Sequence, residues 1–470
     1  MISILYIQNI PDLDSDAYAH LSIARQSLTE GKINPVIHWV WLPLYHYIQI
    51  PFIKLGAGIT FFRYVSLAVS LIIPYIIFFF FRKKFIEQSF INIPLILSFL
   101  CITSPLFILI GTAAQPEAIF CLFVILFLIL FDMEKYFFSS VVLALGVLLR
   151  YEMWTIPFLI MLLIVLKTIF PRINFPLFRK NKLILLNIIL PFLLMIVWTF
   201  VRRISDGNWF YFILETKGFA EDVMKTNAGE SSFIKILSDL IYYPVYIPYM
   251  LSGPVVILGL FGIKRAFKNT SVFYFSVYIL LLLFISLSWT VKSSLGLYRH
   301  FNVIVPFYAV LISCGLFSFA DLFGKFFKKI SSENTKKIFL RIPVFIIFVS
   351  QFYMLYVWSG GWFNCANRTF NERIQTAEFI KSLPQESEIF TDEASVEILS
   401  GLDMNRFRRY WLSTDFASEK VKEKYESKKL FYIVTWESKM EKFQNLGTII
   451  FTSSKDEIYN QAIQVLKINN

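Results

Sequence analysis

The chain has 470 residues, of which 56% are hydrophobic and only 17% are charged, and its formal net charge is +12. Because soluble globular proteins are nearer half apolar and a quarter charged, this composition excludes an ordinary soluble protein. Apolar runs such as 58–81 and 271–288 are long enough to cross about 30 Å of hydrocarbon. These runs are continuous rather than alternating, so they indicate helices and exclude a transmembrane β-barrel.

A series of such runs predicts a polytopic α-helical membrane protein. The candidate spans are 59–81, 91–110, 117–132, 136–149, 153–170, 183–201, 238–262, 271–289, 301–320 and 341–359. Residues 1–10 are too short for a cleavable signal peptide and are consistent with the end of a further span. The four cysteines are too dispersed to predict a disulfide framework.

The basic residues gather in short loops between these spans. The loops are 82–84, 167–182, 264–268 and 325–341, and counting spans places all of them on one side of the membrane. The positive-inside rule assigns that side to the cytoplasm, so the net charge predicts no nucleic-acid partner. We therefore expect a multi-pass protein of the cell (plasma or inner) membrane. Its extracytoplasmic side would carry segments 111–117, 150–152, 202–233, 290–300 and the C-terminal region.

Two domains are predicted. Residues 1–361 form a transmembrane domain with an external loop at 11–58, and the composition becomes polar after Gly360 and Gly361. Residues 362–470 then alternate helical and strand patterns, which predicts a small α/β domain outside the membrane. Its expected helices are 371–383 and 415–427, and its expected strands are 388–391, 430–436 and 448–452.

Three carboxylates, Asp12, Asp14 and Asp16, precede an amphipathic helix predicted over 17–29. A carboxylate at a membrane surface can act as a general base toward an acceptor hydroxyl or amine. It can also bind a divalent cation such as Mg²⁺ or Mn²⁺, since hard cations take oxygen ligands. The structural alternative is a solvated acidic turn that favours the helix dipole.

The segment from Asp16 to Arg25 reads D-A-Y-A-H-L-S-I-A-R and is followed by Gly31 and Pro35. It resembles the first external loop of GT-C-fold glycosyltransferases, such as protein O-mannosyltransferases and the aminoarabinose transferase of lipid A. The resemblance implies a polyprenyl-phosphate-linked sugar as donor, inversion at the sugar carbon and Asp16 as catalytic base. Ala17 stands where the mannosyltransferase pattern often has a second acidic residue, so Asp14 is the candidate to serve in its place.

The string D-A-Y-x-H is also similar to the corresponding loop of single-subunit oligosaccharyltransferases. Their Trp-Trp-Asp signature is absent from the predicted external domain, which argues against transfer to a peptide sequon. In the transferase pattern a lysine often precedes the Pro-Leu pair that opens the next segment. In this chain that pair is Pro43 and Leu44, and Trp41 and Leu42 precede it.

Further charged residues fall at the external ends of spans. Under the resemblance, Glu117 faces the same cavity as Asp16 and holds a metal with it or binds a sugar hydroxyl. Arg299 would bind the donor phosphate, because its planar fork donates two parallel hydrogen bonds. The remaining candidates for substrate or phosphate contacts are Lys292, Arg150, Glu152 and His300. For each of these the alternative is an interfacial charge or a local ion pair.

The sequence thus predicts an inverting membrane glycosyltransferase that uses a polyprenyl-phosphate sugar. Its partners would be membrane lipids, the lipid-linked donor and a glycan, lipid or protein acceptor. A transporter or lipid flippase is the alternative, although such proteins usually show internal repeats, which we do not find. A sensor or scaffold is a third possibility. Loop 205–233 is a candidate lid, and His20, His38 and His46 are interpreted as packing residues rather than ligands.

Overall fold

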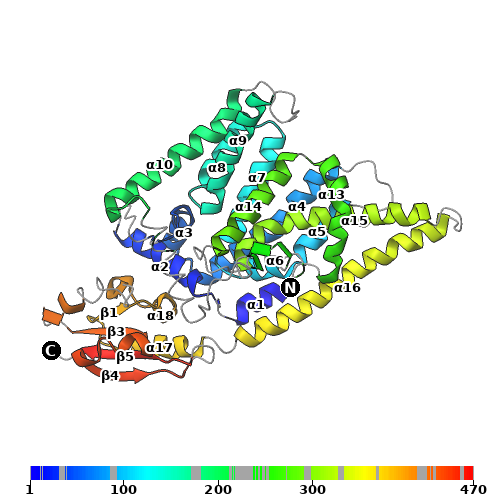
Figure 1. Cartoon of the computed structure of the whole chain (residues 1–470). Helices are drawn as coiled ribbons and strands as arrows, with labels where there is room; N and C mark the ends of the chain where they lie inside the picture. The colour runs from blue at the N-terminus through cyan, green and yellow to red at the C-terminus, as the bar shows by residue number, and fades with distance from the viewer. Residues whose placement is uncertain are drawn as a thin grey trace.

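A computed structural model shows a long helical bundle joined to a small α/β domain (Figure 1). The structure describes residues 2–10, 12, 14–30, 38, 40–84, 93–170, 182–210, 253–270, 272–290, 298–326, 333–366, 370–409, 421–423, 425–426, 430–455 and 460–468, with isolated positions between 214 and 249. Lys292, most of the candidate lid and most of the predicted helix 415–427 lie outside the described residues.

The helices of the bundle follow the apolar runs of the sequence. They are α1 (Ile2–Asn9), α2 (Ser15–Glu30), α3 (Leu44–Lys54), α4 (Ile59–Lys84), α5 (Ile93–Ile102), α6 (Pro105–Gly111), α7 (Glu117–Asp132), α8 (Tyr136–Gly146), α9 (Thr155–Ile169), α10 (Leu186–Asp206), α13 (Ile257–Asn269), α14 (Val272–Thr290), α15 (Val305–Phe326) and α16 (Glu333–Ala366). Short 3₁₀ helices precede four of them: η2 (Tyr151–Trp154), η3 (Lys182–Leu185), η5 (Gly253–Val256) and η6 (Tyr298–Ile304).

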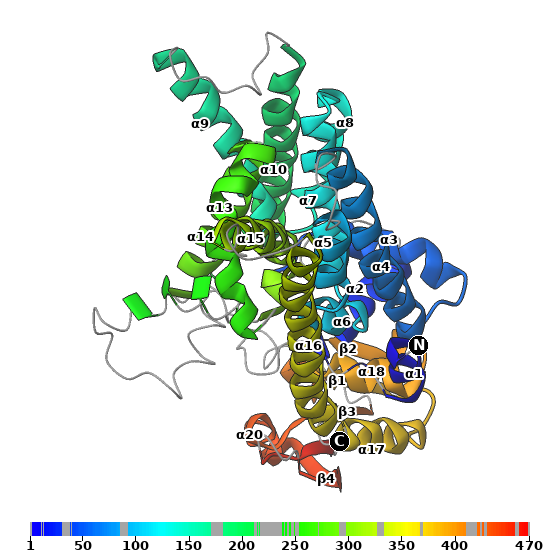
Figure 2. The same ribbon diagram turned by 90° about the vertical axis from the view of Figure 1, so that its right-hand side faces the viewer.

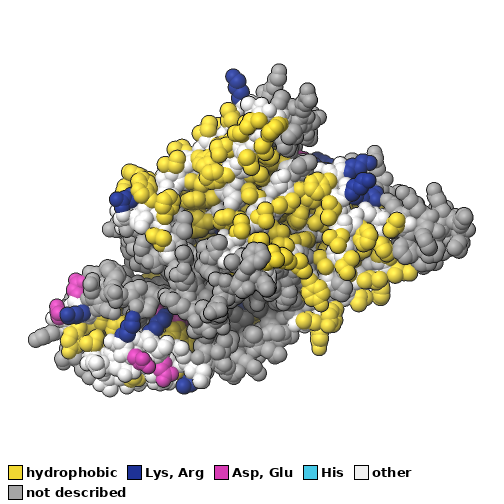
Figure 3. Space-filling model, viewed as in Figure 1, with side chains coloured by type: hydrophobic (Ala, Val, Ile, Leu, Met, Phe, Trp, Pro, Cys, Tyr) yellow, Lys and Arg dark blue, Asp and Glu magenta, His cyan; other side chains and the backbone are white. Residues whose placement is uncertain are grey.

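Within the described part of the chain, five helices are long and apolar enough to cross a membrane. They span Ile59–Lys84, Tyr151–Ile169, Lys182–Ser205, Phe273–Thr290 and Asn302–Phe319. Hydrophobic side chains also cover much of the visible bundle surface, where Lys and Arg side chains appear near its ends, whereas acidic side chains are seen on the α/β domain (Figure 3). The protein is therefore a multi-pass membrane protein, as predicted.

Some predicted boundaries were wrong. The run 91–110 is broken between α5 and α6 at Ser104, because the residue before a proline disfavours the helical conformation. The run 301–320 begins as the 3₁₀ helix η6, which places Arg299 on a regular element rather than in a loop. Helix α2 begins at Ser15 rather than Ala17, so Asp16 lies in its first turn.

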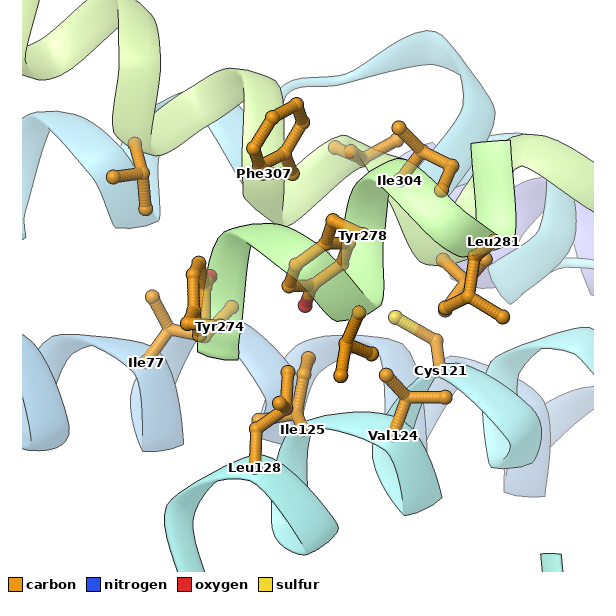
Figure 4. Packing of buried hydrophobic residues seen from close by; sticks show 14 of the residues in the cluster. Ile77, Cys121, Val124, Ile125, Leu128, Tyr274, Tyr278, Leu281, Ile304 and Phe307 are labelled. Atoms are coloured by element: carbon orange, nitrogen blue, oxygen red, sulfur yellow. The ribbon is translucent and has the colours of Figure 1, made fainter. Parts of the chain in front are cut away.

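The centre of the bundle is an apolar layer between α7, α14 and α15. Figure 4 shows Cys121 and Val124 of α7 facing Tyr278 and Leu281 of α14, with Ile304 beside them. These side chains are buried, as is almost the whole apolar face of α7. The packed layer fixes α7, whose first residue is Glu117.

Helices α13 and α15 approach each other through two glycines. A Cβ atom added to Gly262 would lie 1.9 Å from the Leu311 carbonyl oxygen, and one added to Gly315 would lie 1.6 Å from that of Leu258. Only glycine permits such contact, as in the small-residue interfaces of other membrane helices. The crossing anchors α15, which continues from η6 and so fixes the orientation of that element.

The C-terminal domain holds a five-stranded mixed sheet. Its elements are α17 (Asn371–Lys381), β1 (Glu388–Thr391), α18 (Ala394–Ser400), η7 (Met404–Arg406), β2 (Phe407–Arg409), β3 (Phe431–Trp436), α20 (Glu437–Met440), η8 (Gln444–Leu446), β4 (Gly447–Thr452) and β5 (Ile463–Ile468). The strand order is β2-β1-β3-β5-β4. Strand β1 is parallel to β2 and β3, and β5 is antiparallel to β3 and β4. The predicted α/β domain is confirmed, with β2 and β5 in addition.

Helix α16 leads from the bundle to this domain, which packs back against the beginning of the chain (Figure 2). Ala17, Tyr18 and Leu21 of α2 form one apolar cluster with Ala394 and Ile398 of α18. The first helix after the acidic segment is thus held between the bundle and the C-terminal domain.

Candidate active site

The acidic segment begins with a carboxylate that stabilises the fold. Asp12 is buried, and its Oδ2 accepts a hydrogen bond of 2.7 Å from the backbone N–H of Ala114, in the turn between α6 and α7. The same oxygen lies 3.9 Å from Nε of Arg63. Burial raises the pKa of Asp12 to about 6, against the opposing effect of Arg63. These contacts of Asp12 fix the turn before α2 against the bundle.

Asp14 and Asp16 are oriented by successive turns. The Asp14 N–H donates to Oδ1 of Asp12 at 3.2 Å, and the Asp16 N–H donates to Oδ1 of Asp14 at 3.0 Å. The first turn of a helix is a favourable place for a carboxylate such as Asp16, because unsatisfied N–H groups give it partial positive charge. The Asp16 side chain keeps 33% of its surface exposed, so an acceptor can reach it.

Arg299 joins these carboxylates to α7. Its Nη1 donates to Oδ2 of Asp14, its Nη2 donates to Oδ2 of Asp16, and its Nε lies 3.5 Å from Oε1 of Glu117. Although burial opposes a charge here, the Asp14 and Asp16 carboxylates hold the pKa of Arg299 well above its ordinary value. The structure thus brings Asp16, Glu117 and Arg299 together, and their role in one site stays a prediction.

Arg150 extends the group. Its Nη1 lies 2.8 Å from Oε1 of Glu117, and its Nη2 lies 2.7 Å from Oε1 of Glu152. Arg150 and Glu152 are thus more than a local pair, because Glu117 links them to Arg299. We call Asp14, Asp16, Glu117, Arg150, Glu152 and Arg299 the Arg299 network. Fully ionised, its carboxylates outnumber its guanidinium groups by two.

Histidines lie beside the network but differ in role. Burial, with Arg150 and Arg299 nearby, lowers the pKa of His300 well below its ordinary value, so His300 is neutral at pH 7. His20, His46 and His38 form a buried chain of hydrogen bonds, 2.8 Å from His20 Nδ1 to His46 Nε2 and 2.7 Å from His46 Nδ1 to His38 Nδ1. The two bonds use opposite nitrogens of His46, so these rings do not converge on one ion.

The expected divalent cation has no preformed set of ligands among the described residues. No group of three His, Cys, Asp or Glu side chains in that part of the chain is placed to hold an ion. Asp16 and Glu117 do come together, but each directs an oxygen at Arg299. As placed, these residues fit a guanidinium rather than a metal.

Sequence reasoning missed one contact that reaches the site from the C-terminal domain. Glu397 of α18 is 1% exposed, and its two carboxylate oxygens lie 2.8 and 2.9 Å from Oγ of Ser22 in α2. Burial lowers the pKa of the Arg25 guanidinium on the same helix, and the negative charge of Glu397 partly opposes that shift. Ser22 and Glu397 are 375 residues apart, and no local pattern could have paired them.

No protein-family model matches the sequence, and no curated protein matches it significantly. Solved structures, by contrast, do match this chain. ArnT from Cupriavidus metallidurans bound to undecaprenyl phosphate superposes with a TM-score of 0.60 at 10% identity, covering 99% of this chain and 96% of ArnT. The apo form of that protein gives a TM-score of 0.61 with the same identity and coverage.

An oligosaccharyltransferase from Archaeoglobus fulgidus, tethered to an acceptor peptide with an NVT sequon, gives a TM-score of 0.51 at 10% identity. That match covers 89% of this chain and 64% of the oligosaccharyltransferase. Similarity at this level of identity establishes the architecture rather than the activity, and the architecture common to these matches is the one that the acidic loop predicted. The chain has the GT-C fold of membrane glycosyltransferases.

Proposed function

We propose that this protein is an inverting glycosyltransferase. Its donor would be a sugar linked to a polyprenyl phosphate, and its active site would be the Arg299 network on the extracytoplasmic side of the membrane. The single observation that carries the proposal is the contact of one guanidinium fork with both Asp14 and Asp16. This contact brings a phosphate-binding group and a candidate base together although they lie 283 residues apart.

The network supplies the parts that such a reaction needs. The Asp16 carboxylate would remove the proton from an acceptor hydroxyl or amine as that atom attacks the anomeric carbon. The bond from this carbon to the phosphate oxygen would break on the opposite face, which inverts the configuration. Negative charge then accumulates on the leaving phosphate, and Arg299 is the fixed cation that would stabilise it. No step requires a metal ion held by Asp16 and Glu117.

Donor binding would also change the network. In the structure both Nη groups of Arg299 are engaged by carboxylates. A phosphate that took the fork would release Asp14 and Asp16, because one guanidinium cannot present two parallel N–H groups to both partners. Asp16 would become available as a base only once the donor is present. This exchange would keep Asp16 from removing a proton when no donor is bound.

The GT-C architecture of the structural matches favours this function over a transporter or lipid flippase. One of the structural matches, ArnT, was solved bound to undecaprenyl phosphate. The proposal extends that ligand class to the present chain. The sidedness rests on the basic residues at the far ends of α4 and α13, such as Lys84 and Lys268, which the positive-inside rule places in the cytoplasm.

The test is a transfer assay with purified protein in nanodiscs. Undecaprenyl phosphates carrying radiolabelled mannose, glucose or aminoarabinose are each offered with lipid, glycan and peptide acceptors. We expect transfer from at least one donor and a loss of about 10²- to 10⁴-fold for Asp16→Asn, the range of general-base catalysis.

Asp132→Asn is the matched control, because Asp132 also forms an ion pair, 2.7 Å from Lys84, but at the opposite end of α7. It should retain most of the activity. A fully active Asp16→Asn protein at equal membrane expression would show that the base is wrongly assigned. Transfer of no sugar from any donor would remove the proposed function itself.

A further inference from the structure

Two buried amides beside the Arg299 network have no hydrogen-bond partner in the described part of the chain. Asn302 is 1% exposed and Gln115 is 2% exposed, yet neither the nitrogen nor the oxygen of either side chain is paired. The outer carboxylate oxygen of Glu117, Oε2, is likewise buried and unpaired. Such atoms are rare in folded proteins, and each one requires an explanation.

A buried asparagine elsewhere in the bundle shows the ordinary case. Asn187 of α10 is fully buried, its Oδ1 accepts from Oγ of Ser139 at 2.8 Å, and its Nδ2 lies 3.2 Å from the Tyr136 carbonyl oxygen. The amide of Asn187 therefore stabilises the packing of α8 against α10. The side chains of Asn302 and Gln115 form no such bond with any residue that the structure describes, although their burial removes them from water.

The topology places Asn302, Gln115 and Glu117 on elements that pack against one another. Element η6 carries Arg299 and Asn302 one 3₁₀ turn apart, so the two side chains are aligned along it. It packs against α6 and α7, and Gln115 lies in the turn that joins those helices. The Arg299 Nε is 3.5 Å from Oε1 of Glu117, and the backbone carbonyl oxygen of Asn302 is 3.9 Å from Sγ of Cys121, one turn deeper on α7.

In η6, Asn302 stands between Arg299 of the charged network and Ile304 of the apolar layer. Figure 4 shows Ile304 and Cys121 in that layer, and the backbone carbonyl oxygen of Asn302 is near Sγ of Cys121. A side chain at this depth would be better apolar if its task were packing alone, because an unpaired buried amide destabilises the folded state. The presence of the Asn302 and Gln115 amides at this depth therefore supports a role in binding a ligand.

The chemistry of these atoms matches a sugar. Each sugar hydroxyl donates one hydrogen bond and accepts up to two, as any aliphatic hydroxyl does. Two amides offer donors and acceptors, and the free carboxylate oxygen offers an acceptor. We propose that Asn302, Gln115 and Oε2 of Glu117 form the subsite that binds the hydroxyl groups of the donor sugar, directly beside the phosphate-binding fork of Arg299. This assignment rests on the proposed function, and it names the residues that would determine which donor sugar the protein accepts.

The test separates sugar recognition from phosphate recognition. Purified full-length protein in nanodiscs is titrated with undecaprenyl phosphate and with its mannosyl, glucosyl and aminoarabinosyl derivatives. The measured quantity is the ratio of Kd for the sugar-free lipid to Kd for the preferred sugar-bearing lipid. Asn302→Leu and Gln115→Leu should each lower this ratio by about tenfold, the value of one or two hydrogen bonds. Their Kd for undecaprenyl phosphate should stay within about threefold of wild type.

Thermal stability gives an independent measurement. Since Asn302→Leu removes no side-chain hydrogen bond to the described residues, its Tm should equal or exceed that of the wild type. Asn187→Leu is the matched control, because it breaks three hydrogen bonds and should lower the Tm while leaving the ratio unchanged. Arg299→Lys should weaken binding of both kinds of lipid.

Two results would overturn the subsite. The first is an unchanged ratio in Asn302→Leu and Gln115→Leu, and the second is a fall in Tm as large as that of Asn187→Leu, which would show a structural role. If the wild type binds neither undecaprenyl phosphate nor its sugar derivatives and transfers no sugar, the proposed function fails and takes the subsite with it. Lipid binding and transfer without an effect of the two variants would remove the subsite alone.

Discussion

The protein contains two networks of buried charge, and they are built differently. In the C-terminal domain, Oδ1 of Asp392 accepts from Oγ1 of Thr435 at 2.8 Å, and Oδ2 lies 2.6 Å from Nζ of Lys439. The neighbouring Glu393 accepts from Nε1 of Trp436 and lies 3.5 Å from Nε of Arg373. Every carboxylate oxygen of this pair has a partner.

In and beside the Arg299 network, several polar atoms have no hydrogen-bond partner among the described residues. Oε2 of Glu117 is buried without a partner, and the nearby amides of Asn302 and Gln115 are unpaired among the described residues. The C-terminal network lies at the carboxyl ends of β1 and β3, where open α/β sheets often bind ligands, but its groups satisfy one another. The two networks therefore differ in how completely their groups are paired, and the unpaired atoms beside Arg299 are the ones that we propose to bind a ligand.

The largest difference in transfer rate between the two networks is expected when the arginine of each network is replaced. Arg299→Lys replaces a fork by a point charge and should lower the transfer rate by about 10²- to 10³-fold, the usual effect of removing a donor to developing negative charge. Arg373→Lys should leave the rate within about threefold, because the ion pairs of Arg373 with Glu372 and Glu393 lie within its own domain. Initial rates at matched membrane expression measure both. Near-normal turnover of Arg299→Lys would mean that the fork does not bind the phosphate.

A substitution in the C-terminal network should lower the stability of the folded protein and leave its transfer rate unchanged. Lys439→Met leaves the Asp392 side chain, 1% exposed, without its charge partner, which should cost about 1–3 kcal/mol. Rates of limited proteolysis of the full-length protein in detergent would detect the loosened domain. Lys455→Met is the matched control, because its pair with Glu437 is exposed and spans 3.9 Å. If Lys439→Met abolished transfer by intact protein, the C-terminal network would belong to the active site after all.

A smaller effect is expected where the two domains meet. Ser22→Ala removes the hydroxyl that holds Glu397, so α2 and its Asp16 should be less firmly positioned. We expect kcat to fall by about three- to tenfold with little change in KM for the donor, and Ser22→Thr to restore it. Ser27→Ala is the control on the same helix, since its Oγ donates within that helix, to the Ile23 carbonyl oxygen at 2.9 Å. Equal kinetics for Ser22→Ala and Ser27→Ala would contradict a positioning role.

The smallest effect concerns Asp12. Because the folded protein holds a proton on Asp12 up to a pKa of about 6, against an ordinary value near 3.9, its contribution to stability is full below about pH 4. That contribution is lost as the pH rises from about 4 to 6. Asp12→Asn should therefore flatten the change of Tm between pH 4.5 and 7 relative to wild type, as measured in detergent. An unaltered profile would show that other groups set the pH dependence.

The parts that the sequence predicted are those with a local signal. Continuous apolar runs predicted most helices of the bundle, and β1 was predicted at its observed residues, 388–391. Asp16, Glu117 and Arg299 could be grouped because all three fall on the same predicted side of the membrane and the family resemblance places them in one cavity. The break at Ser104 and the early start of α2 were missed, since helix boundaries depend on capping and packing more than on hydrophobicity.

The parts that the sequence could not predict depend on distant neighbours. Asn302 and Gln115 are ordinary residues at the edges of apolar segments, and only burial without a partner distinguishes them. Arg150 could be paired with Glu152 by proximity, but its second bond to Glu117 requires the packing of η2 near α7. Strand β2 is only three residues long, too short to show a period.

The bond between Ser22 and Glu397 has a consequence for biosynthesis. A ribosome makes α2 near the start of the chain and α18 only after the whole bundle has been synthesised. Helix α2 must therefore wait at the membrane surface with its apolar face, including Ala17 and Leu21, not yet covered by the C-terminal domain. The acidic segment acquires these surroundings only when the C-terminal domain folds. A newly made chain consequently completes the packing around α2 only after α16 and α18 have been synthesised.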